Sequence, residues 1–353
     1  MAELNLNEHI SKIHKAVEEW LSQENQVLWK AIDQTVDDGL FSQHDIEFQL
    51  SVLRENISNG DIQEWVNQSE LSDRKNAKGQ KVLCLHAGNL PLVGFQTALG
   101  TLLSGADYHG KLSRKDPYLL SSFLKEVKKA GLDQQIRYST DLNAFKDLRA
   151  NKVVFAGSEE SVPEVKGKIL ELKAAKEHAE YIIRTAKFSI AYLDDWNEET
   201  KQELIEAMLR YGGKGCRSVA VVVANVGLKK VKEELEKAIR EFWELNPQHQ
   251  KPAPDLQYQY AYNAAVQRSQ LWLEDFLIQE SEELPDTDFT VNWVEGGEEK
   301  VRELKTHFGK KVQSVYSAGK KIAGIETEEL AKAQRPNLWW KPDGVDVVEE
   351  LIR

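Results

Sequence analysis

The sequence has little cysteine, no long apolar run and no excess of positive charge. Two cysteines, Cys84 and Cys216, occur among 353 residues, which is too few for a disulfide framework in a chain of this size. Each cysteine is therefore either a small core residue or a reactive thiol. The longest unbroken apolar stretch, near residues 219–224, is far shorter than the roughly 18 residues that suggest a membrane span. We expect a cytoplasmic protein with no membrane partner.

The charge balance is acidic. Lysine and arginine together number 46, aspartate and glutamate together number 57, and the formal net charge is −11. A surface of that sign repels the phosphate backbone of nucleic acids, so we expect no nucleic-acid partner. With 41% hydrophobic and 29% charged residues, the chain has the composition of an ordinary globular protein long enough for two domains.

Several common functional motifs are also missing. The sequence contains no G-x-G-x-x-G, no G-x-x-x-x-G-K-[ST], no H-E-x-x-H and no G-x-S-x-G. His9 and His14 are five residues apart, a spacing that does not place them on one helix face, and two isolated cysteines cannot supply a thiolate cluster. We therefore expect no metal site.

The apolar pattern predicts an α/β fold with a helical N-terminal segment. In residues 1–58 the spacing is helical, with Ile10, Ile13 and Val17 on one face. Beyond that segment, short apolar runs alternate with helical stretches, and such alternation is typical of βαβ units and a doubly wound parallel sheet. The runs are residues 81–86, 136–139 and 152–156, and the helical stretches are 92–103, 118–129 and 162–176.

A second block begins at residue 188 with the strand-like FSIAYL. A helix is predicted over residues 198–210, with Asn197 as its N-cap and glycines after its end. The glycine-rich YGGKGCRS then leads into the apolar run VAVVVA. The reactive candidate of the sequence, Cys216, lies in this glycine-rich segment.

Cys216 follows three glycines within five residues and has Lys214 and Arg217 beside it. Glycines allow a substrate to approach the backbone closely, and neighbouring cations favour the thiolate that acts as a nucleophile. A structural cysteine in a tight turn is the alternative interpretation. Cys84 lies in VLCL, the pattern of a buried strand, and is expected to be a core residue.

A second group of residues carries a family resemblance. A strand ending at His86 is followed by Asn89 and Pro91, a helix, and a strand that runs into Lys111. Further on come FAGS at residues 155–158 and then Cys216, which is 58 residues after Ser158. These markers, in this order, resemble the aldehyde dehydrogenase superfamily.

Within that superfamily the sequence resembles the acyl-CoA reductase family that includes the fatty acid reductase component of bacterial luminescence, often called LuxC-like. The similar segments are His86 before Asn-x-Pro, KLSRKDP at 111–117, GCRS at 215–218 and WWKPDG at 339–344. The resemblance covers roughly residues 80–350, and the first 75 residues are similar only in being helical.

The resemblance implies an aldehyde-dehydrogenase-like fold with three parts. Residues 1–186 would hold the helical N-terminal segment and the dinucleotide-binding domain, residues 187–335 the α/β catalytic domain, and residues 336–353 a C-terminal tail. It implies reduction of an acyl-CoA, or of an acyl-protein thioester, to the aldehyde through an acyl-cysteine. An acyl-donor protein and a homo-oligomer are further partners left open.

The resemblance also assigns roles to single residues. Cys216 would attack the thioester, and Asn89 would donate its amide to the oxyanion. The cofactor's ribose and pyrophosphate would lie on Lys111, Gly157 and Ser158. Taken alone, Asn89 could equally be a turn residue and Lys111 a surface lysine at a strand end.

Cofactor choice is predicted from the residues after Lys111. In this fold they approach the adenosine 2′ position, and here they are Ser113, Arg114 and Lys115. Arginine and lysine suit a 2′-phosphate, whereas a carboxylate would bind a free 2′-hydroxyl. We therefore expect NADPH to be preferred over NADH. A solvated basic turn is the alternative.

Three more residues have two interpretations each. His86 is either a satisfied core histidine or an acid–base group, while Trp340 and Asp343 either belong to core and turn or line the substrate or cofactor pocket. Hydrolytic members of the superfamily carry a glutamate base at the position that falls near Ile183, and Glu180 is three residues away. Two functional alternatives to the reductase remain: an acyltransferase that uses the same cysteine without a nicotinamide cofactor, and a non-catalytic scaffold or binding subunit.

Overall fold

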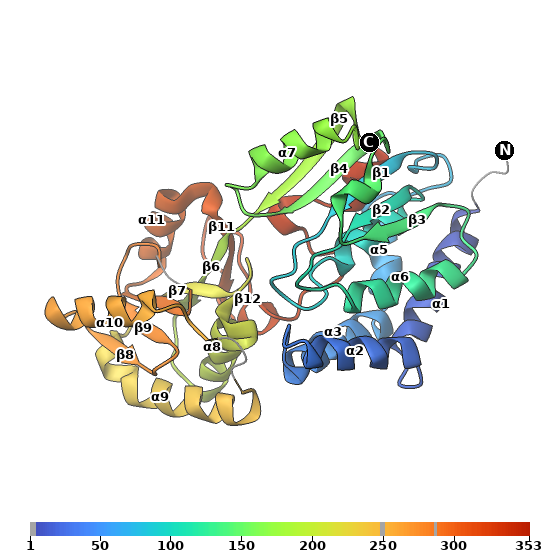
Figure 1. Cartoon of the computed structure of the whole chain (residues 1–353). Coiled ribbons are helices and arrows are strands. Elements are labelled where there is room, and N and C mark those ends of the chain that lie inside the picture. Colours follow the sequence, from blue (N-terminus) through green and yellow to red (C-terminus); the bar gives the residue numbers. More distant parts are fainter. Residues whose placement is uncertain (1–4, 248–250, 286–287) are drawn as a thin grey trace. The chain divides into compact units, whose positions relative to one another are not determined.

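The computed structural model describes residues 5–247, 251–285 and 288–353. The chain divides into two compact units (Figure 1). The first unit comprises the described residues up to Thr185 together with Asn337–Arg353, and the second comprises Ala186–Pro336. Each unit is built around its own sheet, and each is described below by itself. Within the described residues, no helix combines the length and the apolar character that crossing a membrane requires.

Four helices open the first unit, and their amphipathic spacing explains how they pack. They are α1 (Leu6–Leu21), α2 (Gln26–Asp37), α3 (Gln43–Ser58) and α4 (Asp61–Gln68). The predicted apolar face of α1 is confirmed, because Ile10, Ile13 and Val17 are all buried. Trp20 on the same face donates its indole N–H to Ser122 Oγ at 2.8 Å. Ser122 belongs to α6 (Leu119–Lys129), so α1 packs against that helix.

The predicted alternation of strands and helices is confirmed in the first unit. The strands are β1 (Lys81–Leu85), β2 (Asp107–Lys111), β3 (Ile136–Ser139), β4 (Ala150–Gly157) and β5 (Ala175–Thr185). The helices that follow β1, β2 and β4 are α5 (Phe95–Leu103), α6 (Leu119–Lys129) and α7 (Val162–Glu171). The sheet is wholly parallel, with the order β3-β2-β1-β4-β5. At the C-terminus, α12 (Val347–Ile352) packs against α5.

One element of the first unit differs from the prediction. The helix expected over 162–176 ends at Glu171, and strand β5 begins at Ala175. β5 is an edge strand of the sheet. Because an edge strand is half exposed, its sequence AKEHAEYIIRT carries charged residues and lacks the continuous apolar run of a central parallel strand.

The second unit contains a seven-stranded sheet with the order β12-β11-β6-β7-β10-β9-β8. Its strands are β6 (Phe188–Leu193), β7 (Val219–Ala224), β8 (Gln270–Trp272), β9 (Leu277–Glu280), β10 (Thr290–Glu295), β11 (Val312–Ser317) and β12 (Glu328–Glu329). All neighbouring pairs are parallel except β8 and β9. The helices are α8 (Glu198–Leu209), α9 (Leu228–Leu245), α10 (Asp255–Ala265) and α11 (Glu298–Phe308).

The predicted start of α8 is confirmed. The side chain of Asn197 accepts the Thr200 N–H at 3.0 Å, the bond that defines an N-cap. The helix ends at Leu209, and the short 3₁₀ segment Arg210–Gly213 follows it. Cys216 follows this segment and lies three residues before β7, the central strand of the sheet.

Candidate active site

The sheet of the first unit has the topology of a ligand-binding sheet, and its carboxyl edge is called the binding edge below. The chain order of the strands reverses between β1 and β4, which are adjacent in the sheet. In open parallel α/β sheets, ligands bind outside the carboxyl ends of the strands at such a reversal. Asn89 and Ser158 lie in the loops that leave β1 and β4 at this edge, and Lys111 is the last residue of β2. The topology therefore gathers the predicted binding residues of this unit at one edge.

The loop after β1 presents Asn89. Its side chain is exposed, whereas Pro91 and Leu92, shortly after it, are buried. Leu92 has a φ of +58°, a left-handed conformation that costs a leucine about 1–2 kcal/mol. The N–H of Leu92 donates to Asp116 Oδ2 at 2.9 Å, and a hydrogen bond to a charged acceptor of this kind offsets that cost. The loop is thus anchored just beyond the residue expected to bind an oxyanion.

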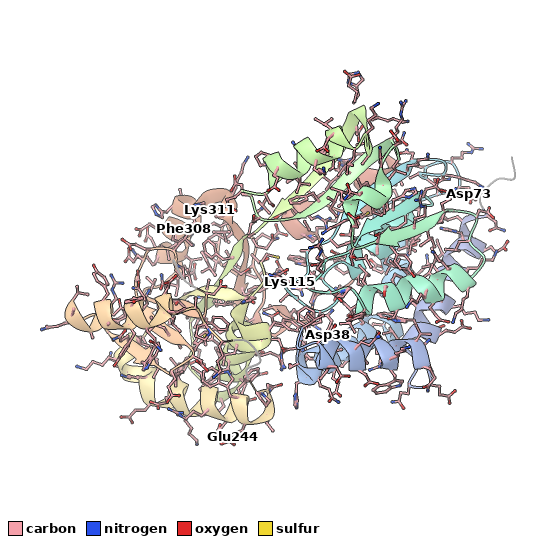
Figure 2. The ribbon with its side chains drawn as sticks, viewed as in Figure 1. Asp38, Asp73, Lys115, Glu244, Phe308 and Lys311 are labelled. Carbon is pink, nitrogen blue, oxygen red and sulfur yellow. The ribbon has the colours of Figure 1, made fainter. Side chains whose placement is uncertain are left out.

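The loop after β2 is basic. Lys111 is half-buried, and burial lowers the pKa of its amine, as does the neighbouring charge of Arg114. Arg114 and Lys115 are exposed, and Lys115 is labelled in Figure 2. Ser113 Oγ accepts the Lys115 N–H at 3.1 Å. Three cations and a hydroxyl in five residues fit the phosphate and ribose groups of a dinucleotide.

Gly157 is the last residue of β4, and Ser158 begins the loop after it. A Cβ added to Gly157 would lie 2.5 Å from the ring of Phe155, so the aromatic ring already occupies the space of a side chain there. Ser158 is exposed, and its carbonyl accepts the Ser161 Oγ–H at 2.8 Å. Helix α7 starts at Val162, and a helix N-terminus favours phosphate. Residues 158–160, which precede this helix, are exposed.

In the second unit, Cys216 lies in a turn between the 3₁₀ segment Arg210–Gly213 and β7. The backbone requires the glycines that precede Cys216, because Gly212, Gly213 and Gly215 have φ values of +70°, +73° and +109°. At Gly213 an added Cβ would lie 2.8 Å from the carbonyl oxygen of Met208. The glycine cluster therefore serves to turn the chain, and it leaves Cys216 half-buried.

Buried polar side chains hold the cysteine turn in place. Ser189 Oγ, from β6, donates to the carbonyl oxygen of Cys216 at 2.8 Å. Ser218 Oγ donates to the carbonyl oxygen of Lys214 at 2.8 Å. Gln334 in turn donates from Nε2 to Ser218 Oγ at 3.3 Å and to the carbonyl oxygen of Ala207 at 3.2 Å. Both ends of the turn are therefore tied to neighbouring elements of the unit, which preorganises its backbone.

Charged and aromatic groups surround the same turn. The Nζ atom of Lys214 lies 3.6 Å from Asp288 Oδ2 and 5.3 Å from the centre of the Phe289 ring. Tyr316 on β11 is fully buried, and burial raises the pKa of its hydroxyl well above the usual range, while the charge of Arg217 lowers it. Tyr316 therefore stays a neutral phenol near the cysteine turn.

Cys84 and His86 belong to the core of the first unit. Cys84 is completely buried beside Thr101, with 3.5 Å between Sγ and Oγ1, and burial raises the pKa of its thiol to about 12. The expectation that Cys84 is a core residue is confirmed. His86 is buried, its Nε2 lies 2.7 Å from the Tyr108 hydroxyl, and burial lowers its pKa to about 3. Its imidazole is therefore neutral at physiological pH.

Trp340 and Asp343 lie in the C-terminal segment of the first unit. Both are half-buried. The carbonyl oxygen of Trp340 accepts a hydrogen bond from Gln96 Nε2 on α5. Asp343 has a φ of +59° within the 3₁₀ turn Pro342–Gly344. The backbone of Trp340 thus attaches this segment to α5, and Asp343 lies in its turn.

The position of a hydrolytic base falls within strand β5. Ile183 is half-buried there, and Glu180 is paired with Lys152, with Oε2 2.8 Å from Nζ. In the register of the sheet, Lys152 opposes Glu180, whereas the carboxyl end of the strand pair is formed by Gly157 and Thr185. Glu180 thus lies five residues before the binding edge, held in an ion pair.

Sequence reasoning missed the residues that hold the two loops and the turn. Asp116, Ser189, Ser218 and Gln334 are all buried polar residues. Asp116 and Ser218 lie in the family-like segments KLSRKDP and GCRS, whereas no motif singles out Ser189 or Gln334. Among the residues that the structure describes, no group of three or more His, Cys, Asp or Glu is placed to hold a metal ion.

The family model for acyl-CoA reductase (LuxC) matches residues 2–307 of the chain. This range includes the N-terminal helices, so the expectation that the resemblance begins near residue 80 is wrong, and it ends before Trp340 and Asp343. All residues expected in catalysis or cofactor binding, from Asn89 to Cys216, lie inside it. No curated protein matches the sequence.

Solved structures of aldehyde dehydrogenases have a similar fold. Aldehyde dehydrogenase 21 from Physcomitrella patens, in complex with the reaction product succinate, has a TM-score of 0.64 at 13% identity, over 98% of this chain and 80% of that one. Lactaldehyde dehydrogenase from Escherichia coli has a TM-score of 0.61 at 15% identity, over 94% and 76%. A methylmalonate-semialdehyde dehydrogenase from Sinorhizobium meliloti, described as putative and complexed with NAD, has a TM-score of 0.56 at 12% identity, over 90% and 74%. The expected aldehyde-dehydrogenase-like α/β fold is confirmed.

Proposed function

Since the chain belongs to the acyl-CoA reductase (LuxC) family and is therefore an oxidoreductase, we propose that it reduces an acyl thioester to the aldehyde with NADPH, through an acyl group carried on Cys216. The substrate is an acyl-CoA or an acyl group on a donor protein. The proposal rests on the turn of Cys216. Its glycines have positive φ, the side chains of Ser189 and Ser218 donate hydrogen bonds to its backbone, and Cys216 itself is half-buried.

The first unit is the proposed cofactor-binding part. Lys111, Gly157 and Ser158 at the carboxyl edge of its sheet would hold the ribose and pyrophosphate of the dinucleotide. The exposed backbone before α7 and the cations after β2 support this assignment, as does the NAD in the similar structure from Sinorhizobium meliloti. When bound, the nicotinamide supplies the hydride, while the protein orients the reacting groups.

The second unit is the proposed catalytic part. The Cys216 thiolate attacks the thioester carbonyl, the oxygen becomes an oxyanion, and the thiolate of CoA leaves, so that the acyl group is bonded to Sγ. In this proposal the amide of Asn89 would donate a hydrogen bond to that oxyanion. After hydride addition, the thiohemiacetal on Cys216 collapses by breaking its C–S bond, which releases the aldehyde and regenerates the cysteine.

One assay separates this function from its alternatives. The purified protein is mixed with a long-chain acyl-CoA and NADPH, and both cofactor oxidation and CoA release are followed. Oxidation of NADPH with aldehyde formation is the expected result. Release of CoA without oxidation would identify an acyltransferase, and neither reaction would leave a scaffold or binding subunit.

The charge at Arg114 is expected to set cofactor choice. In Arg114→Glu, the carboxylate repels a 2′-phosphate and can accept a hydrogen bond from a free 2′-hydroxyl. Because a hydrogen bond to a charged group contributes about 1.5–3 kcal/mol, we expect the ratio of kcat/KM for NADPH to that for NADH to fall by at least about tenfold. Steady-state kinetics with both cofactors measures the ratio.

Lys125→Glu is the matched control for Arg114→Glu. Lys125 is an exposed cation of the same unit on α6, and this substitution changes the net charge by the same amount. It should leave the ratio unchanged. If Arg114→Glu also leaves the ratio unchanged, residues 113–115 are a solvated basic turn and do not contact the cofactor.

Hydrolysis of the acyl-cysteine thioester is expected to be slow. A hydrolytic base is missing at Ile183, and Glu180 is held by Lys152 away from the binding edge, so no carboxylate of β5 activates water against the thioester. Mass spectrometry after mixing with acyl-CoA alone should show a long-lived acyl adduct on the chain. The adduct should disappear when NADPH is added. Rapid release of free fatty acid without cofactor would contradict this expectation.

A further inference from the structure

Two loops of the first unit touch each other at the binding edge. The donor loop, residues 86–94, carries Asn89, and the cofactor loop, residues 112–118, carries Ser113 and Arg114. Gly88 forms the first contact, because an added Cβ there would lie 2.3 Å from Ser113 Oγ and 2.5 Å from Ser113 Cβ. The donor loop therefore approaches the cofactor loop more closely than any side chain at residue 88 would allow.

Asp116 forms the second contact. It is 3% exposed, and its Oδ2 accepts the Leu92 N–H of the donor loop at 2.9 Å. Burial raises the pKa of Asp116 to about 6, while the amides of Leu92, Leu119 and Leu120 lower it. The carboxylate is thus charged at pH 7.5. Its Oδ2 is bonded to Leu92 of the donor loop, whereas its Oδ1 is buried with no hydrogen-bond partner among the described residues. This side chain therefore joins the cofactor loop to the donor loop.

We propose that Asp116 is a positioning residue that couples cofactor binding to the placement of the oxyanion donor. A cofactor bound to Ser113 and Arg114 reduces the mobility of the cofactor loop. Because Asp116 and the Gly88–Ser113 contact join the two loops, the donor loop that carries Asn89 becomes less mobile as well. The donor amide is then aligned when the hydride source is present. This inference rests on the proposed function for the identity of the ligand, but the contacts themselves are independent of it.

Asp116→Asn is the decisive variant. An asparagine has nearly the same shape, but its amide group has only one acceptor oxygen. If that oxygen takes the place of Oδ2, Leu92 keeps only a neutral acceptor, and if the NH₂ group takes that place, Leu92 loses its acceptor. Either way the bond between the two loops is weakened or lost without creating a cavity.

Hydrogen–deuterium exchange in the free protein tests the bridge without any turnover. Amides of residues 87–93 should exchange at least about tenfold faster in Asp116→Asn than in the wild type, because the bonds that hold this loop closed are weakened. Added NADPH should slow exchange of the same segment in the wild type, and markedly less so in Asp116→Asn and in Gly88→Ala. Equal exchange in wild type and Asp116→Asn would overturn the proposal.

Kinetics tests whether Asp116 acts through Asn89. Asp116→Asn should lower kcat on the order of tenfold and raise KM for NADPH. In an Asn89→Ala background, the same substitution should change kcat less than about twofold, since the group it positions is gone. A purely structural role would lower kcat equally in both backgrounds, and that result would contradict the coupling. If Asp116→Asn fails to fold, Gly88→Ala carries the same exchange and kinetic tests.

Asp107→Asn is the matched control. Asp107 accepts the Gln135 N–H at 2.8 Å through Oδ1, so it also joins two segments of the unit through a backbone amide. It lies at the start of β2, the opposite end from the cofactor loop. Its substitution should leave exchange of residues 87–93 and the KM for NADPH unchanged. Absence of NADPH oxidation by the wild type would refute the proposed function only, because the exchange of residues 87–93 in the free protein would still report on Asp116.

Discussion

Replacing Cys216 with alanine is expected to abolish both acyl-enzyme formation and aldehyde production, with a loss of kcat on the order of 10⁴-fold or more. The thiol supplies the only bond to the acyl group in the proposed reaction, and no other group of the turn can replace it. The turn itself is held by backbone carbonyls, with Ser189 Oγ donating to the carbonyl of residue 216. The variant should therefore keep the fold, which circular dichroism and thermal unfolding would verify.

Cys84→Ala is the matched control for this loss. Cys84 is fully buried, and burial raises the pKa of its thiol to about 12, so it is protonated and shielded from substrate. Its replacement should cost about 1 kcal/mol of stability as a large-to-small core change and leave turnover nearly unchanged. Normal turnover by Cys216→Ala, or a loss of turnover in Cys84→Ala without unfolding, would show that the nucleophile has been assigned wrongly.

Replacing Asn89 with alanine is expected to lower kcat by about 10²–10³-fold with little change in KM for the thioester. A hydrogen-bond donor aimed at a developing oxyanion stabilises the transition state more than the bound substrate, and removing one such donor costs about 3–4 kcal/mol of barrier. Asn89 is exposed on a loop whose following residues are buried and bonded to Asp116, so truncating its side chain should not disturb the loop. Single-turnover acylation rates measure the effect on the first chemical step.

Asn151→Ala controls for loss of an asparagine from the same unit. Asn151 Oδ1 accepts the Lys81 N–H at 3.0 Å, near the start of β1 and therefore at the end of the sheet opposite the binding edge. Its truncation should reduce stability modestly and leave kcat intact. If Asn89→Ala and Asn151→Ala have the same small effect on kcat, Asn89 is a turn residue and the oxyanion is stabilised by other groups.

Local features of the chain could be predicted from the sequence because they depend on near neighbours. The buried face of α1 follows from the spacing of Ile10, Ile13 and Val17, and the start of α8 follows from the hydrogen-bonding capacity of Asn197. The turn before β7 follows from its glycines, which adopt positive φ. The order of strands and helices from β1 to α7 in the first unit follows in the same way from runs of apolar residues.

The remaining features depend on residues that are far apart in the chain. Strand β5 is polar because it is an edge strand, and a charged edge strand resembles an exposed helix until the sheet order is known. His86 has the same sequence context as an acid–base residue, yet its burial against Tyr108 keeps it neutral. Only folding reveals which surroundings a titratable side chain has, because desolvation depends on everything packed around it.

The same contrast applies to the candidate site: its binding residues could be predicted from the sequence, whereas the residues that hold them in place could not. Asn89, Lys111 and Cys216 were identified by type and order, since their chemistry is carried by the side chains themselves. Asp116 and Gln334 were not, because their roles arise from contacts with Leu92 and with Ser218, the latter 116 residues away in the chain. A side chain's chemical capacity is a property of the sequence, whereas its partners, its protonation and its alignment are set when the sheet and the loops at its edges bring distant residues within hydrogen-bonding distance.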